Sequence, residues 1–311
     1  MYKIGVFTKY GERKQLYKGY HGSPCKIFKI LDQLKDIVDC EYTFNNYSKD
    51  YDFAIVDRVM PNARIRAKYI LGIFEIKAKG EWATDFCLIS PAAKIIGPNY
   101  FHLLNYCHGR KLDPKQLNKK RNRKGVFLGR LCGTSEFKIK QLNFNGFRLD
   151  IYPIKYWRGK EVLRFHKGAE NFELNKEILQ SILPGSKIRS PISHGGLYQT
   201  LNKKGYRYGF VPSIYGFGSS RMQTESSSKF FEYIGAGTPV LIENNVPEAK
   251  IVKNNPFLGE VFCGKREMLS SAKALEAGRY EYNRILDFAQ KNHYPDSRAR
   301  DIYNNFIKNR R

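Results

Sequence analysis

The sequence predicts an α/β protein with two domains, each organised around a parallel β-sheet. Its 311 residues are enough for about two domains of ~150 residues each. Short apolar runs alternate with amphipathic stretches in both halves, which is the pattern of βαβ units. Residues 110–124 interrupt this pattern with eight basic residues, one acidic residue and no apolar periodicity, so we interpret them as a linker.

The first half contains three predicted strands and one predicted helix. Residues 3–8 form a strand pattern and are followed by a glycine-rich loop. Residues 25–34 carry apolar side chains at positions 27, 28, 30, 31 and 34, which is helical spacing. The runs 51–56 and 68–74 are apolar enough to be buried strands.

The second half repeats the same rhythm. Residues 125–130 and 208–213 read as strands, 229–234 as a short helix, and 238–242 as a central strand. Residues 279–308 have an amphipathic helical pattern that Pro295 should break.

Composition excludes several classes of protein. There are 54 Lys and Arg against 29 Asp and Glu, a net charge of +25, but 42% hydrophobic and 14% aromatic residues argue against a disordered basic tail. No apolar run approaches the ~20 residues of a spanning helix, and we expect no signal peptide. The six cysteines are scattered without a C-x-x-C pair, so we expect reduced thiols and no bound metal.

The segment 226–243 carries the strongest chemical signal. Its serines suit the start of a helix, where free N–H groups form a ready site for an anion. Phe230, Phe231 and Ile234 would form the buried face, and Gly237 could end the helix in the left-handed conformation. Lys229 and Glu232 are three residues apart and lie on one face, so both could contact one ligand.

This segment resembles the donor-domain signature of the GT-B nucleotide-sugar glycosyltransferases, S-x-K-x-x-E-Y-x-A-x-G-x-P-V. Two further matches precede it in the expected order, at residues 126–131 and 210–213. The signature matches at Ser227, Lys229, Glu232, Tyr233, Ala236, Gly237, Pro239 and Val240. The resemblance implies two Rossmann-like domains facing across a cleft: an acceptor-side domain (1–118), a donor domain (119–280) and a helical segment (281–311) that crosses back to the first domain.

The resemblance also implies the donor site and the reaction. Arg130 and the serines would hold the pyrophosphate, Glu232 the ribose, and Lys229 the phosphate or the sugar of a UDP- or GDP-linked hexose or pentose such as UDP-glucose. Arg, Lys and helix N–H groups would stabilise the departing nucleotide, so a divalent metal is not required. The expected donor-binding residues are Gly129, Arg130, Lys138, Ser213, Glu225, Ser227, Ser228, Lys229 and Glu232.

One departure leaves the stereochemistry open. Retaining members place a first Glu eight residues before the second, and that position is Thr224 here, with Glu225 one residue off. An inverting enzyme would instead need a general base, for which His21, Glu75 and Asp85 are the candidates.

The acceptor is inferred from charge and from a fainter second resemblance. Residues 23–30 are similar to the helix that follows the first strand of the phage DNA β-glucosyltransferases. The charge excess favours a polyanionic partner, and we expect a hydroxymethylated base in phage DNA as acceptor, in a monomeric cytoplasmic enzyme (host cytoplasm if phage-encoded). The expected nucleic-acid contacts are Lys119, Lys120, Arg121, Arg123, Arg158, Lys160, Lys203, Lys204 and Arg207.

Two alternatives remain open from the sequence. One is a cell-envelope glycosyltransferase that acts on a lipid-linked or glycan acceptor, with peripheral membrane contact. The other is a non-catalytic nucleic-acid-binding protein on a GT-B scaffold.

Overall fold

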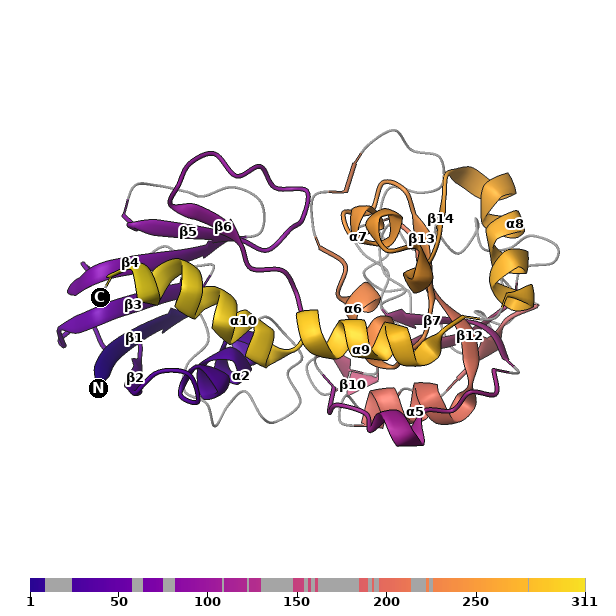
Figure 1. Ribbon diagram of the computed structural model, residues 1–311, viewed down its shortest axis with the longest axis horizontal. Coiled ribbons are helices and arrows are strands. Elements are labelled where there is room, and N and C mark those ends of the chain that lie inside the picture. Colours follow the sequence, from indigo (N-terminus) through magenta and orange to yellow (C-terminus); the bar gives the residue numbers. More distant parts are fainter. Residues whose placement is uncertain are drawn as a thin grey trace. The chain divides into compact units, whose positions relative to one another are not determined.

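A computed structural model shows two compact units, which are described separately (Figure 1). Unit 1 comprises Met1–His108, Thr224–Ser226 and Lys291–Arg311, and unit 2 comprises Gly109–Gln223 and Ser227–Gln290. Apart from the short segment Thr224–Ser226, the chain therefore changes unit at residues 108/109 and 290/291, about ten residues from the predicted breaks after 118 and 280. The structure describes residues 1–8, 24–57, 64–74, 82–107, 109–121, 123–129, 148–153, 156–157, 160–161, 185–189, 192, 196–213, 222–223, 226–278 and 280–310.

Unit 1 contains a six-stranded parallel sheet in the order β2-β1-β3-β4-β5-β6. The strand order reverses at β1, which lies between β2 and β3. The strands are β1 (Tyr2–Thr8), β2 (Cys40–Phe44), β3 (Tyr51–Asp57), β4 (Ala67–Phe74), β5 (Asp85–Leu88) and β6 (Tyr100–His102).

Alternation along the central strands divides the core of unit 1 between the two faces of this sheet. Ile4 and Val6 belong to the cluster that packs against α2 (Pro24–Leu34), whereas Phe7 belongs to a cluster with Tyr51. The C-terminal segment joins the α2 cluster through α10 (Pro295–Ile302) and a π-helical turn (Tyr303–Ile307), and it ends in a 3-10 turn (Lys308–Arg310). α10 begins with the predicted Pro295, whose missing N–H is harmless at the first helical position.

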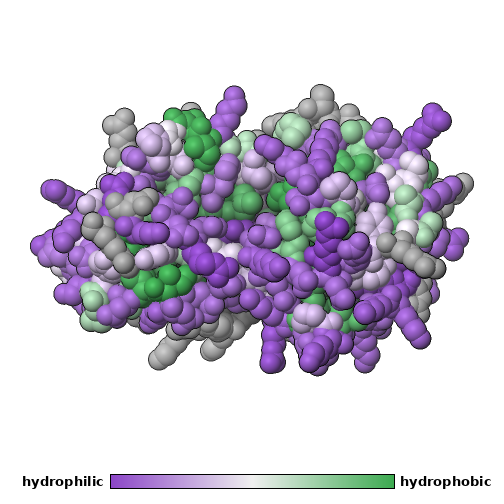
Figure 2. Space-filling view, viewed as in Figure 1, coloured by the Kyte–Doolittle hydropathy of each residue, from purple (hydrophilic) through white to green (hydrophobic). Residues whose placement is uncertain are grey.

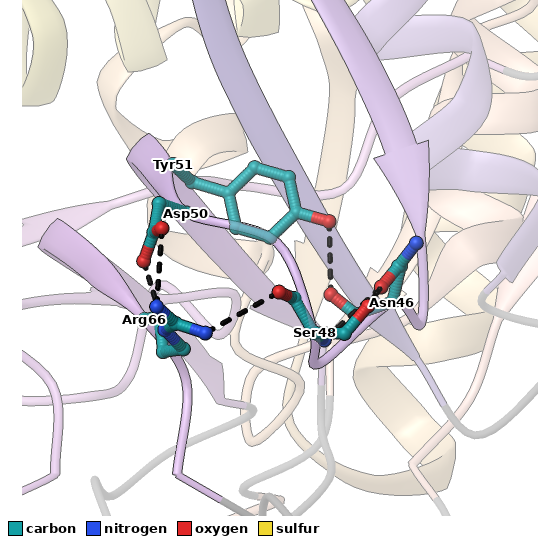
Figure 3. Close-up of polar contacts among 5 residues, drawn as sticks. All are labelled: Asn46, Ser48, Asp50, Tyr51 and Arg66. Carbon is teal, nitrogen blue, oxygen red and sulfur yellow. Dashed lines mark hydrogen bonds and ion pairs between the residues drawn. The ribbon is translucent and has the colours of Figure 1, made fainter.

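The connection between β2 and β3 is short and is held by side chains rather than by a helix (Figure 3). The Tyr51 hydroxyl donates to the Asn46 carbonyl at 2.9 Å, and the Ser48 amide donates to Asn46 Oδ1 at 3.1 Å. Arg66 forms an ion pair with Asp50 at 2.8 Å and donates to the Ser48 carbonyl at 3.4 Å. The ion pair is exposed and contributes at most about 1 kcal/mol, so the buried end of Tyr51 is the main anchor of the connection.

Unit 2 contains a second six-stranded parallel sheet, in the order β11-β8-β7-β12-β13-β14. Its strands are β7 (Arg123–Gly129), β8 (Leu149–Pro153), β11 (Lys187–Ile188), β12 (Tyr206–Val211), β13 (Val240–Glu243) and β14 (Gly259–Phe262), with an antiparallel pair formed by β9 (Tyr156–Trp157) and β10 (Lys160–Glu161). Numbered along the chain, this is the 3-2-1-4-5-6 order of a doubly wound nucleotide-binding fold.

Helices of unit 2 follow the strands in turn. In the described part of the unit they are α5 (Leu197–Lys204), α6 (Ser228–Gly235), α7 (Ala249–Asn254) and α8 (Gly264–Ala277), with 3-10 turns η1 (Pro114–Gln116) and η3 (Pro256–Leu258); α9 (Tyr282–Asn292) crosses the boundary after Gln290. α6 is the helix expected at 229–234, and Gly237 follows it with φ 62°, as predicted. The Thr238 amide donates to the Tyr233 carbonyl at 2.9 Å and closes the helix end.

The basic segment 110–124 is not the linker that composition suggested. Leu112 and Leu117 are buried, Arg121 is 5% exposed, and the segment passes directly into β7. The burial of Leu112 and Leu117 therefore anchors this highly charged segment to unit 2. Among the described residues, no helix is long and apolar enough to cross a membrane.

Candidate nucleotide-sugar donor site

The strand order of unit 2 places a candidate ligand site beside α6. In an open parallel sheet, ligands bind outside the carboxyl ends of the strands at the point where strand order reverses. That point lies between β7 and β12, which pair from Tyr206 opposite Arg123 to Gly209 opposite Val126. Beyond this last pair the two strands are joined by a side chain from α6.

That side chain is Tyr233, whose hydroxyl bridges the ends of the two strands. It accepts the Leu128 N–H at 2.8 Å and shares its proton between the Val126 carbonyl at 3.2 Å and the Phe210 carbonyl at 3.4 Å. Its ring occupies space that a Cβ on Gly209 would enter, because that atom would lie 2.2 Å from the ring. Burial raises the pKa of the phenol, so it stays protonated as a donor. Tyr233 thereby fixes α6 over the switch point.

The N-terminus of α6 is open to an anion. Ser227 is the N-cap residue, but its side chain makes no capping hydrogen bond, and its own N–H donates to Glu248 Oε1 at 2.9 Å. The first turn of a helix leaves N–H groups without helical acceptors, and the helix dipole adds positive potential there. Ser228 is exposed at this end. The arrangement suits a phosphate group.

Lys229 and Glu232 add opposite charges to the same helix. The Lys229 ammonium lies 5.6 Å from the centre of the Phe127 ring on β7, so its side chain extends toward the carboxyl end of that strand. Glu232 is 6% exposed, which is rare for a carboxylate. A buried carboxylate can accept two hydrogen bonds from a vicinal diol such as ribose.

Two further glutamates brace the carboxyl edge of unit 2, and the sequence did not single them out. Glu243 ends β13 and accepts the Ser213 N–H at 2.7 Å, whereas Glu248 accepts the Ser227 N–H. Both carboxylates are almost fully buried. They fix the segment after β12 and the start of α6, so the predicted residue Ser213 is held at this edge by its backbone. Their only sequence signal is an acid at or soon after the end of an apolar strand.

The remaining predicted donor residues are placed only in part. Gly129 is the last residue of β7, at the carboxyl edge. Arg130, Lys138 and Glu225 lie outside the described residues.

The carboxyl edge of unit 1 also gathers polar groups at its switch point. Thr8 ends β1 and pairs with Asp57, the last residue of β3. The Thr8 N–H donates to Asn45 Oδ1 at 2.9 Å, and Asn45 holds this position in the left-handed conformation with φ 49°. Asp57 is 6% exposed. Sequence reasoning missed Asp57, although an acid directly after a buried strand is a signal that could have identified it.

Asp85 does not suit the role of general base that the sequence suggested. It is the first residue of β5 and therefore lies at the amino edge of the sheet, opposite the edge where ligands bind. Both carboxylate oxygens contact Arg310, at 2.9 and 3.2 Å, and Oδ2 also accepts from the Thr84 hydroxyl at 2.7 Å. Asp85 therefore anchors the C-terminal turn. His21 and Glu75 lie outside the described residues.

The expected nucleic-acid contacts do not form a groove at the donor edge. Lys119, Lys120, Lys203, Lys204 and Arg207 come just before β7 or at the start of β12, so they lie at the amino edge of unit 2. Arg123 and Lys160 are described only as strand backbone, and Arg158 lies outside the described residues.

Arg121 is an interior residue rather than a surface contact. It donates to the Gly237 carbonyl at 3.2 Å and stacks 4.5 Å from the centre of the Tyr282 ring. Burial lowers the pKa of its guanidinium to about 10, although the Tyr282 phenol opposes that shift. Within the described part of the chain, no group of three His, Cys, Asp or Glu could hold a metal ion.

Comparisons with known proteins agree on the fold. No model of a protein family matches the chain, and no curated protein sequence matches it. Solved structures do match over nearly the whole chain. The lipopolysaccharide outer core galactosyltransferase WaaB matches with a TM-score of 0.62 and 11% identity over 99% of both chains. HepE of Anabaena in complex with UDP matches with a TM-score of 0.60 and 10% identity over 98% of this chain and 100% of its own.

A glycosyltransferase from Rickettsia africae also matches, with a TM-score of 0.61 and 10% identity over 99% of both chains. At these identities the likeness concerns the fold. The chain has the α/β architecture of the GT-B glycosyltransferases, as the signature in α6 predicted.

Proposed function

We propose that the protein is a glycosyltransferase that moves a sugar from a nucleotide-sugar donor to a hydroxyl group of an acceptor. The observation that carries the proposal is the start of α6, where an uncapped helix end, Lys229 and the buried Glu232 meet at the switch point of a nucleotide-binding sheet. Structural neighbours of this fold include HepE in complex with UDP-glucose, which supports a uridine nucleotide as the donor.

The reaction would exchange one bond at the anomeric carbon. The acceptor oxygen forms a bond to that carbon, while the bond from the carbon to the donor phosphate oxygen breaks. The electron pair leaves with the nucleoside diphosphate. The N–H groups of α6 and Lys229 would stabilise its new charge, because they already point at the phosphate and need not rearrange. Glu232 would hold the ribose, Ser227 and Ser228 the pyrophosphate, and Arg130 and Lys138 the phosphates from the segment that follows β7.

The acceptor side would be the carboxyl edge of unit 1. If the reaction inverts the sugar, a base there must take the acceptor proton. His21 follows β1 and Glu75 follows β4 in the chain, and the structure adds Asp57 at the end of β3. We propose Asp57 in place of Asp85 as the third candidate.

For the acceptor we propose a hydroxymethylated base in DNA. The excess of 25 positive charges supports a polyanion, since a solubility requirement alone is met by a net charge of about 2–8. Such a base must leave the stack before it can react, which costs a few kcal/mol that backbone contacts would offset. A glycan acceptor is the second candidate, because the neighbour WaaB is named as a lipopolysaccharide galactosyltransferase.

A pair of isosteric variants tests the donor and acceptor assignments separately. Glu232→Gln should weaken UDP binding about 10- to 100-fold, because a hydrogen bond to a charged group contributes about 1.5–3 kcal/mol. Asp57→Asn should leave UDP binding unchanged and slow transfer by about 10²- to 10⁴-fold if Asp57 is the base. Asp85→Asn is the matched control, because it removes a carboxylate from the opposite edge and should leave the transfer rate unchanged.

The measurements are calorimetry with UDP and mass spectrometry of the products. Hydroxymethylated DNA, unmodified DNA and a glycan acceptor are each incubated with UDP- and GDP-linked sugars. Full UDP affinity in Glu232→Gln would remove that residue from the site. Transfer to the glycan and not to hydroxymethylated DNA would replace the proposed acceptor.

A further inference from the structure

Two segments far apart in the sequence are joined at the amino edge of unit 2. The Asn118 N–H donates to Asn202 Oδ1 at 2.8 Å, and Asn118 Nδ2 donates to the Asn202 carbonyl at 3.1 Å. Asn202 Nδ2 returns a bond to the Gln116 carbonyl at 3.0 Å. Asn202 is 8% exposed, so these bonds are shielded from water. They fix the segment after η1 against the last turn of α5, and the two segments lie side by side in Figure 1.

A glycine makes this approach possible. Gly205 ends α5 with φ 67°, a conformation that other residues rarely adopt. A Cβ at this position would lie 2.6 Å from the Lys120 carbonyl oxygen, so only glycine lets the two backbones meet. The contact sets Lys119 and Lys120 beside Lys203 and Lys204.

These four lysines form a concentrated positive patch, which we call the lysine patch. All four are exposed. Asp113 is the only acidic residue within 109–121 and 196–207, and its carboxylate caps η1 by accepting the Lys115 N–H. No ion pair joins the four lysines to any residue that the structure describes. Figure 2 shows a mostly hydrophilic surface over α5 and η1.

Helix stability accounts for only part of this arrangement. Lys203 and Lys204 lie in the last turn of α5, where each contributes about 0.3–1 kcal/mol through the helix dipole. Lys119 and Lys120 belong to no helix, and bringing them close adds repulsion. A local excess of like charge that the fold brings together is stabilised when an anionic partner neutralises it.

The lysine patch is distinct from the donor site. It lies at the amino end of β12, whereas Ser213 and the start of α6 lie at the carboxyl edge. The six residue steps from Arg207 to Ser213 span roughly 20 Å at the rise of a strand. A single nucleotide sugar at α6 therefore does not reach the patch.

The chemistry of the patch fits a phosphate backbone better than a lipid surface. Interfacial docking uses Trp, Phe or Leu side chains that enter the lipid beside the cations. The exposed large hydrophobic residues of the described chain are Met1, Ile95, Ile96 and Met222, and none belongs to either segment. Lysines are point charges that contact phosphates without reading sequence.

We propose that the lysine patch is a sequence-independent docking site for the phosphate backbone of DNA, remote from the donor site. The proposal rests on the proposed DNA acceptor and extends it. The patch holds the duplex on unit 2 while a single base is presented for reaction, so part of the cost of unstacking is offset by contacts that do not depend on sequence.

The test compares two variants of equal charge by their salt dependence. The patch variant carries Lys→Gln at positions 119, 120, 203 and 204. The control carries Lys→Gln at positions 250, 273, 291 and 308, which are exposed lysines outside the patch. Binding of an unmodified 20-base-pair duplex is measured by fluorescence anisotropy between 50 and 200 mM salt. Each phosphate contact contributes about 0.9 to the slope of log K against log salt.

The expected result is a slope shallower by about 3.6 in the patch variant, with the control close to the unmodified protein. Equal slopes in the two variants would overturn the proposal. So would a patch variant that keeps its DNA affinity and loses binding to vesicles of phosphatidylserine and phosphatidylcholine. UDP affinity, measured in parallel, should be the same in all three proteins and confirms that unit 2 is folded.

This design separates the proposal from the proposed function. If DNA binding depends on the patch but hydroxymethylated DNA is not glycosylated, the docking site stands and the acceptor is wrong. If the DNA is glycosylated equally by the patch variant and the control at every salt concentration, the docking proposal fails while the function stands.

Discussion

Removing the hydroxyl of Tyr233 tests whether this side chain holds the strands of unit 2 at their switch point. Tyr233→Phe keeps the ring that fills the space beside Gly209 and removes only the oxygen that joins β7, β12 and α6. The Leu128 N–H, which donates to that oxygen at 2.8 Å, loses its acceptor.

The expected loss in the free energy of unfolding follows from the burial of the groups involved. Leu128 is 8% exposed and Tyr233 is fully buried, so water cannot simply replace the lost hydroxyl. A buried donor left without a partner costs about 1–3 kcal/mol. No apolar contact is lost, so we expect a destabilisation of about 2 kcal/mol rather than the ~3–5 kcal/mol of a large-to-small change such as Phe→Ala.

Amide hydrogen exchange gives the most direct readout, because it reports on Leu128 itself. A loss of ~2 kcal/mol corresponds to roughly 30-fold faster exchange at that amide, since ~1.4 kcal/mol is tenfold. Tyr100→Phe is the control, because it removes a hydroxyl from a half-buried ring that stacks on Phe86 in unit 1. Unchanged protection of Leu128 in Tyr233→Phe would refute the bridging role.

Two further predictions concern packing and pH. Gly209→Ala should destabilise the protein by about 3 kcal/mol or more in urea unfolding, because its Cβ would overlap the Tyr233 ring, whereas Gly97→Ala makes only an ordinary contact and should change little. Burial and the charge of Arg298 lower the pKa of His293 to about 3, below the ~6.5 of an unfolded chain. The unfolded state therefore binds the proton first, and the free energy of unfolding should fall by ~2 kcal/mol from pH 7 to pH 5; an equal fall in His293→Gln would exclude His293 as its source.

The sequence predicted the centre of each sheet better than its edges. The run 51–56 is almost wholly buried and the run 68–74 is buried from Leu71 onward, and their continuous apolar pattern matches β3 and β4. β2 and β6 are edge strands with half-exposed side chains, and β11 has two residues, so their patterns cannot be separated from loops. The strand expected at 208–213 ends two residues early, where Pro212 lacks the N–H needed to continue pairing.

Within the site, the sequence predicted correctly those features that depend only on residues close together in the chain. The start of α6, the shared face of Lys229 and Glu232 and the left-handed Gly237 all depend on neighbours within one helical turn. Glu243 and Glu248 were missed because their partners, Ser213 and Ser227, are 30 and 21 residues away in the chain. A carboxylate that braces a backbone N–H has no signature of its own type or spacing.

The direction of the strands distinguishes candidate residues that the sequence alone treats as equivalent. Asp57 and Asp85 are both acids at the ends of apolar strands, and composition treats them alike. In a parallel sheet the end of β3 and the start of β5 lie at opposite edges, so Asp57 lies at the carboxyl edge of unit 1, where ligands of such sheets bind, and Asp85 does not. The same reasoning separates the lysines of unit 2 into two groups at opposite edges of its sheet. Lys229 lies at the carboxyl edge and suits a donor phosphate, whereas the lysine patch lies at the amino edge and can act only on a partner long enough to reach beyond the donor.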